Sequence, residues 1–139
     1  MGLFRIVGNF LDSVFEFLVN LVAALIATAI LAVGAVIELA VDILSWINDG
    51  IEELLDAGST EVNVIKGSAM ADFIRISQAN GNYTEITYTQ LKEMDTSVIN
   101  VANNNNEVHK TQMIKSDKGL SDATNERFAG KDVLKIKIA

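Results

Sequence analysis

The stretch that decides the predicted fold runs from Phe17 to Ile37 and reads FLVNLVAALIATAILAVGAVI. Its twenty-one residues include no charged side chain, and Asn20 and Thr28 are its only polar ones. An uncharged run of about twenty residues is long enough to cross the roughly 30 Å hydrocarbon core of a bilayer. The sequence therefore predicts a segment that is inserted in a membrane or buried in the core of a protein-only assembly, and both alternatives stay open.

A stripe of polar or small residues continues this pattern on both sides. Its members are spaced by threes and fours, which gives the α-helical period of about 3.6 residues. They are Arg5, Asn9, Asp12, Glu16, Asn20, Ala24, Thr28, Ala32, Ala35, Glu38, Asp42, Ser45, Asp49, Glu52 and Asp56. We therefore expect one continuous helix over residues 3–56, with a narrow polar face and a wide apolar face. Gly58 and the turn-forming residues beside it are typical of a helix end.

The small residues in the middle of the stripe predict close packing between helices. Small side chains let helix backbones approach each other, as they do in membranes. The predicted packing seam consists of Asn20, Ala24, Thr28, Ala32 and Ala35. The two acidic ends of the stripe consist of Asp12, Glu16, Glu38 and Asp42. We expect these ends to face a polar lumen, to be solvated or to pair with basic residues of another subunit. Trp46 follows the apolar run and is predicted to be an interfacial anchor or an ordinary packing residue.

After residue 58 the hydrophobic period changes from 3.6 to 2, which indicates strands. The predicted strands are Glu61–Lys66, Asp72–Ser77, Tyr83–Thr89, Ser97–Ala102, Glu107–Ile114 and Val133–Ile138. The Asn80-Gly81 pair is typical of a hairpin turn, and a short helix is expected over residues 121–128. The fold class is therefore predicted to be α+β, with one long apolar helix in residues 1–58 and a small antiparallel β domain in residues 59–139.

The composition excludes several classes of function. The chain has 11 Lys and Arg against 18 Asp and Glu, so nucleic acid is not an expected partner. It has no cysteine and one histidine, so we expect no metal site and no cofactor. That histidine, His109, is predicted to be a solvated strand residue. Phosphate-binding loops and nucleophile elbows are absent from the sequence, so we expect a protein that is not an enzyme.

The layout of a long apolar helix followed by a small β-rich domain resembles the architecture of type IV pilins. Small membrane proteins of lipid-containing virions and pore-forming proteins share this layout. The sequence thus predicts a homo-oligomeric structural protein of a filament, virion-membrane or secretion-type assembly, with a lipid bilayer as a further partner. One alternative is a pore-forming protein whose lumen is lined by the polar stripe. Another is a membrane-anchored binding module whose β domain takes an unknown protein partner.

The predicted location is membrane-associated or an extracellular assembly. If the helix spans a membrane, Arg5 is the only basic residue on either flank. The excess of basic residues on the cytoplasmic side of membrane proteins then places the N-terminus in the cytoplasm and the C-terminal domain outside.

Overall fold

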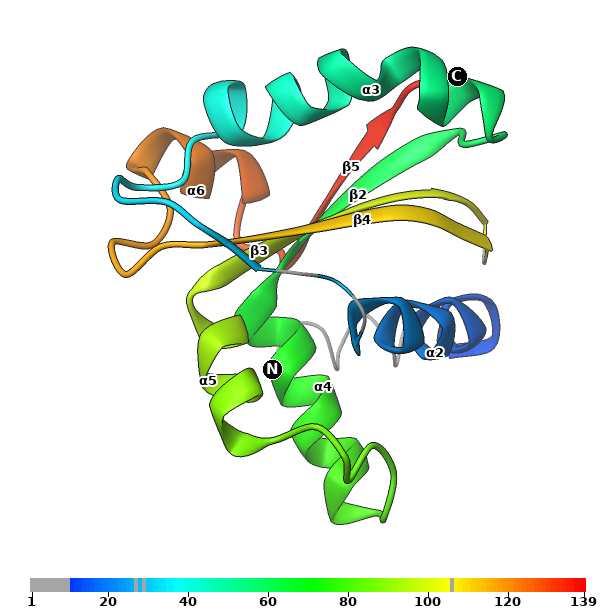
Figure 1. The fold of residues 1–139 in the computed structure, drawn as a ribbon, viewed down its shortest axis with the longest axis vertical. Coiled ribbons are helices and arrows are strands. Elements are labelled where there is room, and N and C mark those ends of the chain that lie inside the picture. The colour runs from blue at the N-terminus through cyan, green and yellow to red at the C-terminus, as the bar shows by residue number, and fades with distance from the viewer. Residues whose placement is uncertain (1–10, 27, 29, 106) are drawn as a thin grey trace.

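In the computed structural model of this chain, a mixed five-stranded sheet lies between two layers of helices (Figure 1). The structure describes residues 11–26, 28, 30–105 and 107–139, and it describes side chains from residue 19 onward. The elements are α2 (Leu11–Ile26), β1 (Ile30–Ala32), the π-helix η1 (Leu39–Ile43), α3 (Leu44–Asp56), β2 (Glu61–Lys66), α4 (Gly67–Ala79), α5 (Tyr88–Asp95), β3 (Ser97–Asn104), β4 (Glu107–Lys115), α6 (Asp122–Phe128) and β5 (Val133–Lys137). The α+β class is confirmed.

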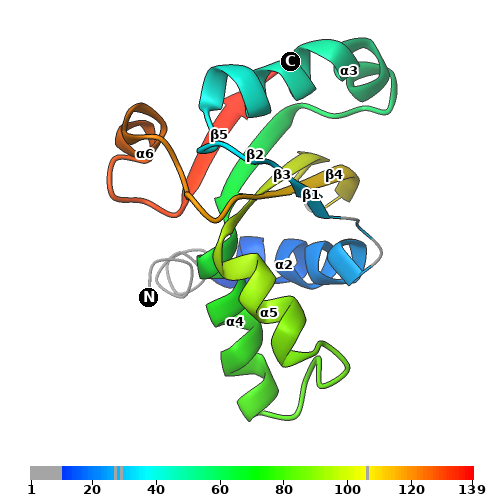
Figure 2. The ribbon, with the colours of Figure 1, turned by 60° about the vertical axis from the view of Figure 1, so that its left-hand side comes forward.

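The strand order is β1-β4-β3-β2-β5. Helices α2, α4 and α5 cover one face of the sheet, and α3 and α6 cover the other (Figures 1 and 2). β1 is parallel to β4, whereas the other neighbouring strands are antiparallel. The predicted all-antiparallel sheet is therefore wrong at this edge. Segments on both sides of residue 58 contribute strands to one sheet.

The prediction of a continuous helix over residues 3–56 is wrong. Helix α2 ends at Ile26, the chain then forms strand β1, and helical structure resumes only at Leu39. Residues 3–10 lie outside the described part of the chain. Among the described residues, no helix combines the length and the apolar character that crossing a membrane needs. The long apolar N-terminal helix is thus replaced by two shorter helices on opposite faces of the sheet.

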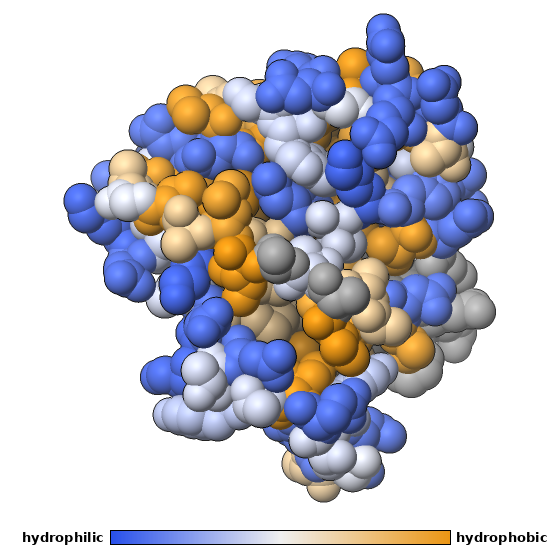
Figure 3. Space-filling model, in the orientation of Figure 1, coloured by the Kyte–Doolittle hydropathy of each residue, from blue (hydrophilic) through white to orange (hydrophobic). Residues whose placement is uncertain are grey.

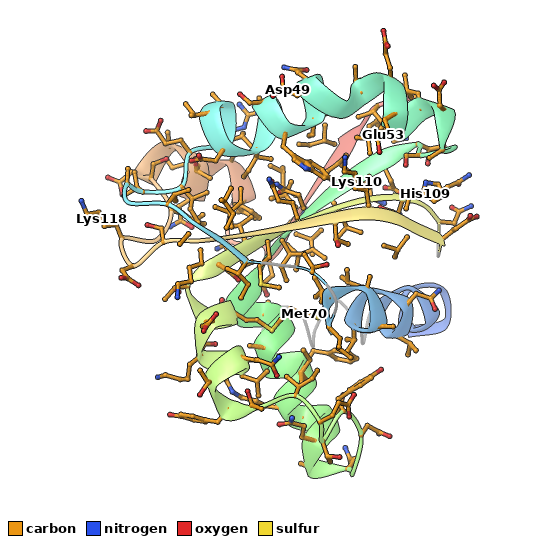
Figure 4. The ribbon with its side chains drawn as sticks, viewed as in Figure 1. Asp49, Glu53, Met70, His109, Lys110 and Lys118 are labelled. Atoms are coloured by element: carbon orange, nitrogen blue, oxygen red, sulfur yellow. The ribbon has the colours of Figure 1, made fainter. Side chains whose placement is uncertain are left out.

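Burial explains why the chain breaks in this region. A helix that is apolar over most of its surface needs neighbours on several sides. With the break, Leu21 and Leu25 of α2 are buried against α4, α5 and one sheet face. Ile43 and Ile47 are buried against the other face. The single sheet therefore buries apolar side chains of both helices among the residues whose side chains are described. The acidic residues of the stripe in α3 stay on its solvent side, Asp49 among them (Figure 4).

Several elements of the C-terminal half match their predictions. β2, β3, β4, β5 and α6 lie within about one or two residues of the predicted ranges, and β3 and β4 pair as antiparallel neighbours. The strands predicted at Asp72–Ser77 and Tyr83–Thr89 are wrong. The first of these segments belongs to α4. The second consists of the loop before α5 and the first two residues of α5. The Asn80-Gly81 pair ends α4 with a positive φ at Gly81, so it terminates a helix and forms no hairpin.

Candidate functional site

The two edges of the sheet differ in charge. β5, at one edge, carries the exposed residues Lys135 and Lys137, and Lys135 Nζ lies 3.2 Å from Glu61 Oε2. Charged side chains, lysine above all, keep edge strands from pairing with other chains. β1, at the other edge, reads Ile-Leu-Ala and lies within a run that has no charge between Glu16 and Glu38. The β1 edge therefore lacks this protection.

Apolar side chains are exposed beside this edge. Leu31 is 54% exposed and Ile26 is 51% exposed. We call the group of Ile26, Ile30, Leu31 and Ala32 the β1 edge surface. Ile30 pairs in register with Met113 and packs on the core under α2, whereas Leu31 pairs with Ile114 on the opposite face. The surface thus combines an open strand edge with apolar side chains on both of its faces.

A small cavity of about 70 Å³ opens beside β1. It lies between α2, α5 and the sheet, and Figure 3 shows a hollow flanked by apolar side chains in this region. Its lining residues are Val22, Leu25, Ile26, Thr28, Ile30, Ile74, Ile86, Gln90, Met94 and Met113. Because methionine side chains are unbranched and adaptable, the two in this lining can adjust to an apolar group that enters.

The loop between α4 and α5 contributes Ile86 to the lining of this cavity. Gln78 Nε2 donates hydrogen bonds to the carbonyl oxygens of Tyr83 and Ile86, at 2.9 and 2.8 Å. Ile86 is thereby held toward the cavity. Burial raises the pKa of Tyr83 above its ordinary value, and the charge of Glu85 raises it further. The two hydrogen bonds from the Gln78 side chain to backbone carbonyl oxygens therefore fix the loop to α4.

An ion pair joins α4 to α5. Arg75 Nη1 and Nη2 lie 3.0 and 2.8 Å from Asp95 Oδ1 and Oδ2, which is a bidentate contact. Arg75 Nη1 also lies 3.2 Å from Asp72 Oδ1. The hydrogen bonds with Asp95 raise the pKa of Arg75, and burial opposes this effect. The side chain of Arg75 is 35% exposed, so solvent weakens the ion pair. The pair therefore fixes the geometry of the two helices and adds little to stability.

The residues of the predicted seam do not share one helix face. Asn20 and Ala24 lie on α2, Thr28 lies in the link after it, Ala32 lies in β1 and Ala35 lies in the bend that follows. Asn20, Ala32 and Ala35 are exposed, and the other two are half-buried. Thr28 Oγ1 donates a hydrogen bond of 2.9 Å to the carbonyl oxygen of Ala24. Only Ala32 belongs to the β1 edge surface.

The predicted acidic ends and the predicted anchor are distributed over several elements. Asp12 and Glu16 belong to α2, and their side chains lie outside the described part. Asp42 Oδ2 accepts a hydrogen bond of 2.8 Å from the backbone N–H of Glu38, at the start of η1. Trp46 is half-buried against the apolar core under α3, so in this structure it is a packing residue.

The prediction that His109 is solvated is wrong. Its side chain is 10% exposed, and its Nδ1 lies 2.6 Å from Ser59 Oγ. Its Nε2 lies 3.4 Å from Glu107 Oε1. Serine, histidine and glutamate are the residue types of some hydrolytic triads, but Ser59 is only 2% exposed and offers a substrate no access to its hydroxyl. We interpret the contact as packing between the start of β2 and β4.

A neighbouring ion pair fastens α3 to the same end of β4. Glu53 and Lys110 point toward each other (Figure 4), with Lys110 Nζ 3.3 Å from Glu53 Oε2.

Among the residues with described positions, no group of three or more His, Asp and Glu residues could hold a metal ion. No family model, curated protein or solved structure matches this chain.

Proposed function

We propose that this chain is a non-enzymatic, homo-oligomeric structural protein whose copies associate through the β1 edge surface. The observation that carries the proposal is the contrast between the two sheet edges. β5 has lysines at its edge, whereas β1 is uncharged and has Leu31 54% exposed beside it. Natural proteins protect their edge strands by charge, proline or covering elements, so an unprotected apolar edge indicates a surface that pairs with another chain.

The same geometry favours association over a pore. The pore-forming alternative places Asn20 and Thr28 on one face of one helix, but α2 ends between them at Ile26. We therefore do not propose a pore. A binding module remains the second candidate, because an open edge also accepts an extended segment of another protein. The exposed apolar side chains favour a second copy, which offers the same apolar surface in return.

Sedimentation velocity of the full chain over a range of concentrations tests the proposal. We expect a concentration-dependent oligomer that Leu31→Lys weakens by about tenfold or more, because a lysine at an edge strand opposes pairing. Leu55→Lys is the matched control, since Leu55 is 43% exposed on α3, away from β1. This variant should sediment as the wild type does.

Salt gives an independent readout. Each copy carries a formal net charge of −7, so two copies repel each other at low ionic strength. Raising the NaCl concentration should therefore strengthen an association that depends on apolar contact and backbone pairing. Monomers at every concentration and salt level would contradict the proposal. Equal weakening by Leu31→Lys and Leu55→Lys would show that the copies meet elsewhere.

A further inference from the structure

The backbone of β1 determines how a second copy can pair with it. The N–H of Val33 donates to the carbonyl oxygen of Lys115 in β4, at 2.9 Å. Backbone groups alternate in direction along a strand, so the peptide groups of Leu31 also face β4. Those of Ile30 and Ala32 face the open edge. In the described part of the chain, the sheet has no strand on that side.

These outward groups are arranged symmetrically about Leu31. We propose that two copies pair their β1 strands antiparallel, with a two-fold axis that passes beside Leu31. Ile30 then lies opposite Ala32 of the second copy, and each of these two pairs exchanges two N–H···O bonds. Leu31 lies opposite its own counterpart. The inference rests on the proposed function, and it adds the register and the symmetry of the contact.

The side chains fit this register. Leu31 becomes a non-hydrogen-bonded pair across the axis, the type of pair in which side chains on one face come closest. Both copies of Leu31 lie on the same face as Ile114, so the axis brings two exposed leucines together. The pairing strand contains no charge and no proline, so neither repulsion nor a missing N–H opposes it.

The symmetry also closes the assembly at this surface. A two-fold contact uses the same patch on both copies and so leaves none of it open. The opposite backbone edge of β1 already pairs with β4 within each copy, so only its outward edge is available to a second copy. The antiparallel arrangement joins the two sheets into one continuous sheet, whose outer edges are the lysine-bearing β5 strands. Further growth by edge pairing is therefore opposed at both ends.

Single cysteines test the register directly, because the chain has no native cysteine. In the proposed register the Cα atoms of the two Leu31 residues are about 4.5 Å apart, within the range of a disulfide. The two Ile30 residues are about 8 Å apart, beyond that range. Under oxidation with diamide, Leu31→Cys should form at least about tenfold more disulfide dimer than Ile30→Cys.

Two further samples complete the experiment. An equal mixture of Ile30→Cys and Ala32→Cys should form the mixed disulfide, because these residues oppose each other across the axis. Tyr88→Cys, at a 74% exposed position on α5, measures random collision. Efficient Ile30→Cys dimers, or Leu31→Cys dimers no more abundant than those of Tyr88→Cys, would overturn the pairing. If the cross-linking fails but the wild-type chain oligomerises in sedimentation, only the register is wrong and the proposed function still holds. A wild-type chain that stays monomeric overturns both.

Discussion

The side-chain hydroxyl of Thr28 lies 2.6 Å from that of Thr111, and this contact joins the link after α2 to strand β4. Thr28 Oγ1 also donates to the carbonyl oxygen of Ala24 at 2.9 Å, so in the contact with Thr111 it acts as the acceptor. Two hydrogen bonds thus meet at one half-buried oxygen at the point where the helix gives way to β1. This position turns the chain from the helical layer into the sheet.

The first prediction is that Thr28→Val lowers the free energy of unfolding by about 1–2 kcal/mol. Valine keeps the shape of the side chain but leaves the Thr111 hydroxyl without its acceptor. Urea unfolding of the full chain measures the loss. Thr84→Val, at an exposed loop position, is the control and should change stability by less than about 0.5 kcal/mol. Equal losses in the two variants would show that the hydrogen bond contributes nothing.

Local sequence pattern predicted β2, β3, β4 and β5 but not the break near residue 30. The helical period persists on both sides of β1 because α2 and α3 are each amphipathic helices. The break depends on pairing with β4, and Thr28 and Thr111 are 83 positions apart in sequence. A periodicity confined to neighbouring residues contains no information about such a contact, and tertiary pairing overrides local propensity here.

Two other differences have separate causes. The segment Asp72–Ser77 alternates over six residues, but the longer spacing of Ala69, Met70, Phe73 and Ile74, all buried, is helical. That signal was available in the sequence. The burial of His109 was not, because a bulge shifts the register between Ala102 and Asn103 and leaves the histidine unpaired in the ladder. The β1 edge surface also depends on strand order, which local pattern does not give.

The second prediction is that Gly67→Ala destabilises the chain by about 3 kcal/mol or more. A Cβ atom at Gly67 would lie 2.1 Å from both the carbonyl oxygen of Met94 and Ser97 Oγ, and 2.7 Å from the carbonyl oxygen of Ser97. Two of these atoms belong to the backbone, so the start of α4 would have to move away from the end of α5 and the start of β3. Thermal unfolding followed by circular dichroism measures the effect.

Gly50→Ala is the matched control for that variant. A Cβ atom at Gly50, inside α3, would meet nothing within 4 Å. Alanine forms helix better than glycine, so this variant should be more stable than the wild type by about 0.5–1 kcal/mol. Gly67→Ala is therefore expected to lower the stability of the chain and Gly50→Ala to raise it. A Gly67→Ala variant as stable as the wild type would show that α4 does not approach β3 so closely.

The third prediction concerns the contact between Ser59 and His109. Ser59→Ala removes the partner of His109 Nδ1, 2.6 Å away, and leaves a mostly buried ring nitrogen unsatisfied, at a cost of about 1–3 kcal/mol. The double variant Ser59→Ala with His109→Phe removes both polar groups and should cost less than the sum of the single variants. Urea unfolding of the four proteins gives the coupling energy. A coupling near zero would show that the two side chains do not interact in solution.

The fourth prediction is that Tyr83→Phe reduces the loss of stability at alkaline pH. Burial, with the charge of Glu85, raises the pKa of Tyr83 in the folded chain. The phenol ionises first in the unfolded chain, near its ordinary pKa of about 10. Above that pH the unfolded state is favoured, so the free energy of unfolding falls until the pH has passed the folded-state pKa. Phenylalanine cannot ionise and removes this contribution.

Chemical unfolding at about pH 9 and about pH 11 measures the difference between the two proteins. The comparison is between the losses of stability of the wild type and of Tyr83→Phe, so contributions common to both proteins cancel, and the wild type should lose more. Tyr88→Phe is the control, because the side chain of Tyr88 is 74% exposed and meets water in both states. It should lose as much stability as the wild type does. If Tyr83→Phe lost the same amount as both, the phenol of Tyr83 would not be packed against the core in solution.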